Sequence, residues 1–155
     1  MTKVPINIRS ALKGDAKMMQ AIASAAYQPY IEEMGRKPAP MIADFDAHIA
    51  KDVCLVLWLA GKIAGYAVIL HRADGYWLEN IAVHPEHHKK GLGTALIETV
   101  EAIIRPRADH YQLYTNILMR SNARWYFSLG FKQTKEAVEG GFHRLYFKKK
   151  HYRNR

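Results

Sequence analysis

Apolar and polar residues follow two different periods along the chain, and these periods predict most of its elements. Residues 4–11 (VPINIRSA) alternate between apolar and polar, which is typical of a strand. Residues 14–28 have the spacing of an amphipathic helix, for which Asp15 is the expected N-cap. Three prolines interrupt residues 29–41, so no long element is expected there, and a short second helix is predicted at residues 42–52.

The middle of the chain is the most apolar part. Residues 53–60 (VCLVLWLA) and 62–72 (KIAGYAVILHR) are two apolar runs that meet at Gly61-Lys62, which predicts a β-hairpin. Residues 75–83 (GYWLENIAV) form a further strand that ends at His84-Pro85. A helix is predicted at residues 94–105, and its apolar face consists of Leu96, Ile97, Val100, Ile103 and Ile104. The remaining elements are strands at 111–118, 131–139 and 142–150, with a short helix at 121–130.

This order of elements predicts an α/β fold of the α+β kind, a mixed and mostly antiparallel sheet flanked by helices. The hairpins exclude a purely parallel sheet. The chain shows no internal repeat, low-complexity segment or linker. We therefore expect a single domain over residues 1–150 and a basic tail over residues 151–155.

Composition narrows the class of protein. Nearly half of the 155 residues are apolar, which is enough for a buried core, and no apolar run is long enough to span a bilayer. The first residues lack the apolar region of an export signal, and Cys54 is the single cysteine, so a cytoplasmic protein is expected. Cys54 lies in an apolar strand without a neighbouring base, which favours a buried thiol over a nucleophile.

The formal net charge of +9 favours anionic partners such as phosphorylated cofactors or nucleic acid. Part of the charge lies in the C-terminal KKKHYRNR, which is expected to be a solvated terminus. Another part lies in His87, His88, Lys89 and Lys90, directly before a glycine loop. A metal site at His84, His87 and His88 is not expected, because Pro85 interrupts the segment and no carboxylate–histidine pattern supports it.

Gly91 and Gly93 separate a predicted strand from a predicted helix. The first amides of a helix have no internal partner, and the helix dipole adds positive charge there, so such a loop can hold a phosphate. A dinucleotide fingerprint requires a glycine where Leu96 stands, and a Walker A loop requires its lysine after the glycines. By itself, Gly-Leu-Gly before a helix is better explained as a plain tight turn.

A wider stretch resembles a known family. Residues 78–101 (LENIAVHPEHHKKGLGTALIETVE) resemble the central motif of the GNAT superfamily of N-acetyltransferases, in which Gln/Arg-x-x-Gly-x-Gly/Ala joins a strand to a helix. His88 stands in the first position of that motif instead of Gln or Arg. Residues 122–131 (NARWYFSLGF) resemble the second motif of the family, with Tyr126 four residues before Gly130-Phe131. The predicted order of elements agrees with this family over nearly the whole chain.

The resemblance implies an enzyme that moves an acetyl group from acetyl-CoA to a primary amine of a small molecule or peptide, by direct transfer in a ternary complex. The cofactor would lie where the strand at 75–83 separates from the strand at 111–118. Main-chain groups at Ile81, Ala82 and Val83 would bind its pantetheine arm, and Asn122 either contacts coenzyme A or caps its own helix. The residues expected at the pyrophosphate are His88, Lys89, Lys90, Gly91, Leu92, Gly93 and Thr94.

Two side chains are candidates for proton transfer. Glu79 precedes the cofactor-binding stretch of its strand and is the candidate general base; the alternative is a solvated or ion-paired carboxylate. Tyr126 occupies the family position that protonates the leaving thiolate. Its alternative is an aromatic residue packed in the core, as Trp125 and Phe127 are expected to be.

The acceptor is the least determined part. By resemblance, the first helices and last strands form its pocket, with Tyr27, Tyr30, Glu33 and Asn116 as weak candidates and Phe142 or Tyr146 opposite. One alternative acceptor is an RNA-bound or ribosomal amine, and another alternative is a non-catalytic basic module that binds nucleic acid. The family also suggests a homodimer through the last two strands.

Overall fold

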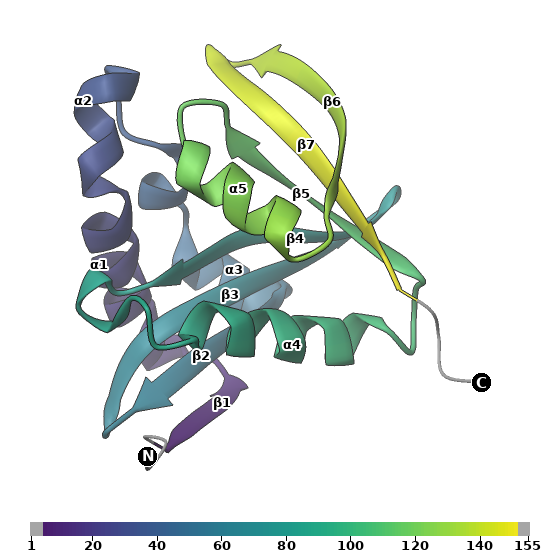
Figure 1. The fold of residues 1–155 in the computed structure, drawn as a ribbon. Coiled ribbons are helices and arrows are strands. Elements are labelled where there is room, and N and C mark those ends of the chain that lie inside the picture. Colours follow the sequence, from purple (N-terminus) through teal and green to yellow (C-terminus); the bar gives the residue numbers. More distant parts are fainter. Residues whose placement is uncertain (1–4, 152–155) are drawn as a thin grey trace.

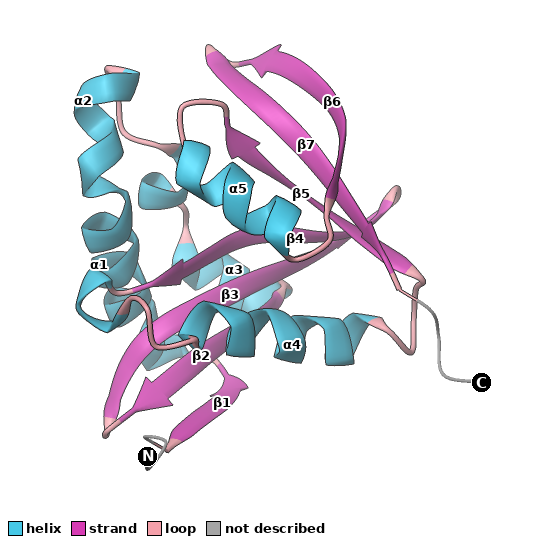
Figure 2. Cartoon of the chain, in the orientation of Figure 1, coloured by secondary structure: helices cyan, strands magenta, loops and turns pink. Residues whose placement is uncertain are grey.

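The structure is a computed structural model in which residues 5–151 are described. Seven strands form one sheet in the order β1-β2-β3-β4-β5-β7-β6, as Figures 1 and 2 show. The strands are β1 (Ile6–Ser10), β2 (Val53–Leu59), β3 (Lys62–Arg72), β4 (Gly75–Val83), β5 (His110–Asn116), β6 (Lys132–Glu139) and β7 (Phe142–Lys150). The α-helices of the described residues are α1 (Ala16–Tyr27), α2 (Ile31–Met34), α3 (Phe45–Lys51), α4 (Leu92–Ile104) and α5 (Arg120–Ser128).

The sheet is mixed and mostly antiparallel, which confirms the predicted fold class. Every neighbouring pair of strands is antiparallel except β4 and β5, which the α4 crossover joins in parallel. The predicted hairpin is confirmed as β2 and β3. Its strands read as continuous apolar runs because both faces of the sheet are covered. Leu55 and Leu57 pack toward α4, whereas Cys54 and Val56 pack toward α1 and α3.

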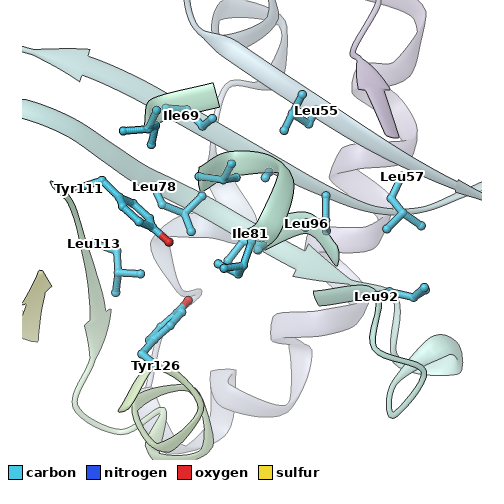
Figure 3. Packing of buried hydrophobic residues seen from close by; sticks show 14 of the residues in the cluster. Leu55, Leu57, Ile69, Leu78, Ile81, Leu92, Leu96, Tyr111, Leu113 and Tyr126 are labelled. Carbon is cyan, nitrogen blue, oxygen red and sulfur yellow. The ribbon is translucent and has the colours of Figure 1, made fainter. Parts of the chain in front are cut away.

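Two cores therefore lie on opposite faces of the sheet. The core under α4 and α5 includes Leu96, Ile97 and Val100 from the predicted apolar face of α4, and Figure 3 shows part of it. Ile103 lies half-buried at the edge of that face, while Glu101 is buried, because its carboxylate accepts hydrogen bonds from the Tyr111 hydroxyl and the Lys149 ammonium at 2.7 Å each.

Asp15 is the N-cap residue of α1, as predicted, but its side chain does not cap the helix. The residue has helical dihedral angles and makes no side-chain cap bond to α1. Its carboxylate turns back to accept a bond from the Leu12 amide at 2.7 Å and from Arg9 at 2.8 Å, and the bond from Arg9 lowers the pKa of the Asp15 carboxyl. α1 begins at Ala16, directly after a short 3₁₀ turn at Lys13–Asp15.

The proline-rich stretch forms no long element, as predicted. It contains the one-turn helix α2, which ends at Gly35 in the left-handed conformation. Of the predicted tail, residues 152–155 lie outside the described residues. His151 is buried rather than solvated, and its ring N–H donates to the Ala108 carbonyl at 2.8 Å. Among the described residues, no helix is long and apolar enough to cross a membrane.

Candidate active site

The site begins where β4 and β5 separate. These strands pair only at Trp77 and Gln112, near the start of β4. Beyond that residue pair, the edge of β4 on the side of β5 borders a gap, as the family resemblance implied for these two strands. The register between β3 and β4 also shifts here: Val68 pairs with Asn80 and Ile69 with Leu78, which leaves Glu79 as an extra residue. Such a bulge turns a side chain out of the regular alternation of the strand.

Two cavities open along this gap. The larger one, here the loop cavity, measures about 1330 Å³ and reaches the glycine loop. The smaller one, here the strand cavity, measures about 510 Å³, is open to solvent and lies between β4, β5 and the start of β7. Both cavities are lined by Tyr27, Ile81, Asn122 and Tyr126. The two spaces therefore meet at one point beside β4.

The glycine loop has the backbone of an anion site. Gly91 has a φ of 76° and Lys89 a φ of 64°, so the chain curls into two left-handed positions before α4 begins at Leu92. Within the described part of the chain, no hydrogen-bond partner is found for the amides of Leu92, Gly93 and Thr94. These residues all line the loop cavity, where the positive end of the α4 dipole adds to their effect.

The basic side chains of the loop have different positions. Lys89 lines the loop cavity, and so does His87, which the sequence analysis had not selected as a cofactor contact. Lys90 is not among the residues that line it; its ammonium donates to the His87 ring at 3.2 Å. The ring N–H of His88 donates to the Val83 carbonyl at 3.1 Å, so His88 ties the loop back to the end of β4.

Trp125 packs against the core under α4 and α5 and also forms a wall of the loop cavity. The residue is half-buried, and a Cβ atom placed on Gly93 would lie 3.0 Å from its indole ring. A core position for Phe127 is wrong, because the residue is 51% exposed, although its ring makes a T-shaped contact with Phe147. Phe127 comes four residues after the buried Ala123 and so lies on the same side of the helix, which makes its exposure one that the sequence pattern alone did not reveal.

Tyr126 lies at the junction of the cavities. Its ring packs edge-on against Phe131 in the core, and Figure 3 shows its hydroxyl directed from α5 toward the sheet. The hydroxyl has no hydrogen-bond partner among the described residues and is not sealed from solvent. Burial raises the pKa of this phenol well above its usual value of 10, so it keeps its proton at neutral pH. Both the functional and the core interpretation of Tyr126 therefore describe part of its environment.

Tyr27 reaches the same junction from α1. Its buried hydroxyl donates to the Ile81 carbonyl at 2.9 Å, and burial raises the pKa of this phenol as well. Ile81 lines both cavities, whereas Ala82 and Val83 line the loop cavity alone. Asn122 is not the N-cap of α5, which is Met119, but it lies in the first turn of that helix, as its alternative interpretation allowed. Its amide contacts the Met119 sulfur at 3.6 Å.

Glu79 is the acidic residue of the strand cavity. Its carboxylate accepts a hydrogen bond from the Tyr114 hydroxyl on β5 at 3.0 Å, across the gap between the strands. Asn116 lines the same cavity, although its side-chain oxygen accepts the Leu118 amide at 2.9 Å. Arg144 and Phe142 enter the cavity from β7, and the sequence analysis had named only Phe142 of these two.

The other candidates lie further out. Tyr30 lines the loop cavity, and its hydroxyl is 3.2 Å from the Ser121 hydroxyl. Glu33 is exposed on α2 and is not among the residues that line either cavity. Cys54 is buried in the core under α1, and burial raises the pKa of its thiol to about 12. The described residues contain no group of three or more His, Cys, Asp or Glu side chains placed to hold a metal ion.

Comparison with known proteins identifies the family. A model of the GNAT acetyltransferase domain matches residues 50–133, which include β2 to β4, the glycine loop, α4 and α5. The chain belongs to the GNAT acetyltransferase family. It is an acyltransferase, as the sequence motifs predicted, and no curated protein is a significant match to it.

Solved GNAT structures share the fold over nearly their whole length. A GCN5-related N-acetyltransferase from Rhodopseudomonas palustris is 20% identical with a TM-score of 0.80, covering 97% of this chain and 98% of that one. The ribosomal-protein-S18-alanine N-acetyltransferase of Escherichia coli is 19% identical with a TM-score of 0.72, covering 97% of each chain. The PaiA N-acetyltransferase of Thermoplasma acidophilum, in complex with coenzyme A, is 17% identical with a TM-score of 0.76. That match covers 95% of this chain and 99% of the other.

Proposed function

We propose that this GNAT protein transfers an acetyl group from acetyl-CoA to the primary amine of a small molecule or peptide. The observation that carries the proposal is the junction of two cavities at Tyr27, Ile81, Asn122 and Tyr126. A cofactor in the loop cavity and an amine in the strand cavity would meet there. This arrangement suits direct transfer within a ternary complex.

The loop cavity fits coenzyme A by its hydrogen-bonding groups and its charge. The free amides of Leu92, Gly93 and Thr94 suit a pyrophosphate, and Lys89 adds positive charge beside them. The unpaired edge of β4 from Ile81 to Val83 offers main-chain groups to an amide-containing arm such as pantetheine. Acetyl-CoA, when bound, supplies the acetyl group as a reactive thioester.

Glu79 would remove the proton from the acceptor. An alkyl ammonium has a pKa of about 10 and cannot attack a thioester until it is deprotonated. The Tyr114 hydroxyl holds the Glu79 carboxylate at the strand cavity, and one carboxylate oxygen remains for the amine or for a bridging water. Glu79 is therefore our proposed general base, and Tyr114 a positioning residue.

Tyr126 would donate to the sulfur as it leaves. Its phenol keeps its proton because burial raises its pKa, and its hydroxyl reaches the junction without another partner among the described residues. Cys54 does not line either cavity and stays a neutral thiol at neutral pH, which supports transfer without an acyl-cysteine.

A second candidate acceptor is an RNA-bound or ribosomal amine. The net charge of +9 favours it, and one structural neighbour is an acetyltransferase of a ribosomal protein. Membership of an enzyme family speaks against the alternative of a purely non-catalytic nucleic-acid-binding module. Inhibition of acetyl transfer by added RNA, relieved by salt, would favour this second acceptor.

Calorimetric titration tests the cofactor. We expect micromolar binding of both acetyl-CoA and coenzyme A, and much weaker binding of acetyl-pantetheine, which lacks the pyrophosphate. Equal binding of acetyl-pantetheine would contradict the role of the glycine loop. Absence of acetyl-CoA binding at moderate salt would overturn the proposal.

A further inference from the structure

The strand cavity contains two charged side chains of opposite sign. Among its lining residues, all of which belong to the described chain, Glu79 is the only acid and Arg144 the only base. The charged residues stand on different strands, β4 and β7, and the Tyr114 side chain lies between them. Its hydroxyl bonds Glu79 at 3.0 Å, while the Arg144 guanidinium lies 4.4 Å from its ring centre.

Arg144 is held in place by aromatic rings. Its guanidinium lies 5.3 Å from the Phe142 ring centre in addition to its contact with Tyr114, and its side chain is 19% exposed. On β7 it pairs with Asn116, which also lines the strand cavity. Stacking uses the face of a guanidinium and leaves its N–H groups, which lie in the plane, available to an acceptor.

The one ion pair of Arg144 among the described contacts is weak. The nearest Glu139 carboxylate oxygen is 3.6 Å from a guanidinium nitrogen, beyond the range of a good hydrogen bond. The same Glu139 oxygen also accepts the Tyr146 hydroxyl, and Glu139 is not among the residues that line the cavity. Glu139 and Tyr146 therefore share part of the guanidinium, and because a guanidinium has five N–H groups, Arg144 keeps donors for a ligand.

Building on the proposed function, we infer that the acceptor is a small amine that also carries a carboxylate, as an amino acid does, and that Arg144 selects that carboxylate. Glu79 would hold the ammonium end, and Arg144 would bind the carboxylate through charge-assisted hydrogen bonds. A polyamine would instead place a second ammonium near Arg144, which is unfavourable. The opening of the cavity to solvent and its aromatic walls, which include Tyr114 and Phe142, suit a small molecule.

The test compares acids with their uncharged counterparts. Purified protein and acetyl-CoA are assayed for thiol release with the standard L-amino acids, each beside its carboxamide. For at least one amino acid we expect kcat/KM to exceed that of its carboxamide by about 10- to 100-fold, the effect of one charge-assisted contact. Arg144→Gln should remove this preference by lowering kcat/KM for the acid by a larger factor than kcat/KM for the carboxamide.

Two further variants separate recognition from folding. Arg144→Lys keeps the charge and should retain part of the preference. Arg36→Gln is the matched control, because Arg36 lies 3.8 Å from the centre of the same Phe142 ring but does not line the cavity. It should leave the preference unchanged. Melting temperatures and acetyl-CoA titrations of all variants report folding and cofactor binding separately.

The outcomes are distinguishable. Equal use of acids and carboxamides, or an acid preference that survives in Arg144→Gln, would overturn the inference while leaving the acetyltransferase proposal intact. Acetylation of polyamines alone would do the same. If acetyl-CoA itself does not bind, the proposed function fails first, and the inference fails with it.

Discussion

Glu79 owes its position to one extra residue in β4. Without the bulge, the side chains of β4 before and after Glu79 would alternate strictly between the two faces of the sheet. Because the bulge lies beyond the last pair with β5, the carboxylate extends across the gap to the Tyr114 hydroxyl. A residue with an ordinary strand sequence around it thereby becomes available for chemistry.

Replacing Glu79 by Gln should lower turnover mainly at low pH. The amide cannot accept a proton, so the variant depends on amine that is already deprotonated, and this fraction rises toward the amine pKa of about 10. We expect a loss of about 100-fold near pH 7 that shrinks as the pH rises, measured as a pH profile of kcat. Glu98→Gln, which removes an exposed carboxylate of α4, is the control. A full rate across the pH range would remove Glu79 from the mechanism.

Tyr126→Phe should separate the two roles of this side chain. The phenyl ring keeps the packing against Phe131, so stability should change little, whereas the lost hydroxyl should reduce turnover by about 10- to 100-fold. Acetyl-CoA affinity, measured by calorimetry, should stay within about threefold. Tyr76→Phe, away from both cavities, is the matched control. A large fall in melting temperature with unchanged turnover would assign Tyr126 to the core alone.

At the scale of elements, α4 and α5 together form the loop cavity. The first turn of α4 presents its amides, and Trp125 of α5 lies against Gly93 in that turn. The φ of Gly93 is not in the left-handed region, so the backbone conformation does not require glycine there. Glycine at residue 93 instead allows the close contact between α4 and α5. Gly91, by contrast, has open space around its Cα, and its left-handed φ is the reason for glycine there.

Gly93→Ala should weaken acetyl-CoA binding by about tenfold. The added methyl group would lie 3.0 Å from the Trp125 indole and would force that ring to move within the cavity it lines. Calorimetry should show the loss, and adding Trp125→Leu should restore part of the affinity because it removes the clash. Gly14→Ala, with no atom within 4 Å of the new Cβ, should have no effect. Unchanged affinity in Gly93→Ala would show that Trp125 does not shape the binding site.

At the scale of the whole molecule, a partly buried ionic cluster joins α4 to the half of the sheet that contains β5 and β7. Glu101 on α4 accepts bonds from Tyr111 on β5 and Lys149 on β7, at 2.7 Å each, and lies 3.7 Å from Arg105. The cluster lies at the end of α4 away from the glycine loop. It connects the crossover helix to strands on the far side of the gap between β4 and β5.

Lys149→Met should therefore lower stability without affecting catalysis. Removal of the ammonium leaves the Glu101 carboxylate buried with a weaker set of partners, at a cost of about 2 kcal/mol, less than for a fully buried pair because Lys149 is partly exposed. Thermal unfolding should show a fall of about 4–8 °C. Lys150→Met, which removes a charge at an exposed neighbour, is the control. An unchanged melting temperature would show that the cluster contributes no net stability.

Local patterns determined most of the fold and part of the site. The spacing of apolar residues and the turn residues between them specify a strand or helix over a few neighbouring residues. The strands, α4 and the glycine loop therefore followed from the sequence. The resemblance to GNAT proteins rested on residues close together in the chain, from Leu78 to Glu101 and from Asn122 to Phe131. The family model confirms that assignment.

Only the tertiary structure decided which distant residues share the cavities. The bulge at Glu79 is a property of pairing between β3 and β4, and Arg144 reaches the strand cavity because β7 lies beside β5. Likewise, Phe127 remains exposed although the two residues before it, Trp125 and Tyr126, pack in or against the core. These outcomes depend on strand register and helix orientation between segments far apart in the chain, which a local pattern does not encode.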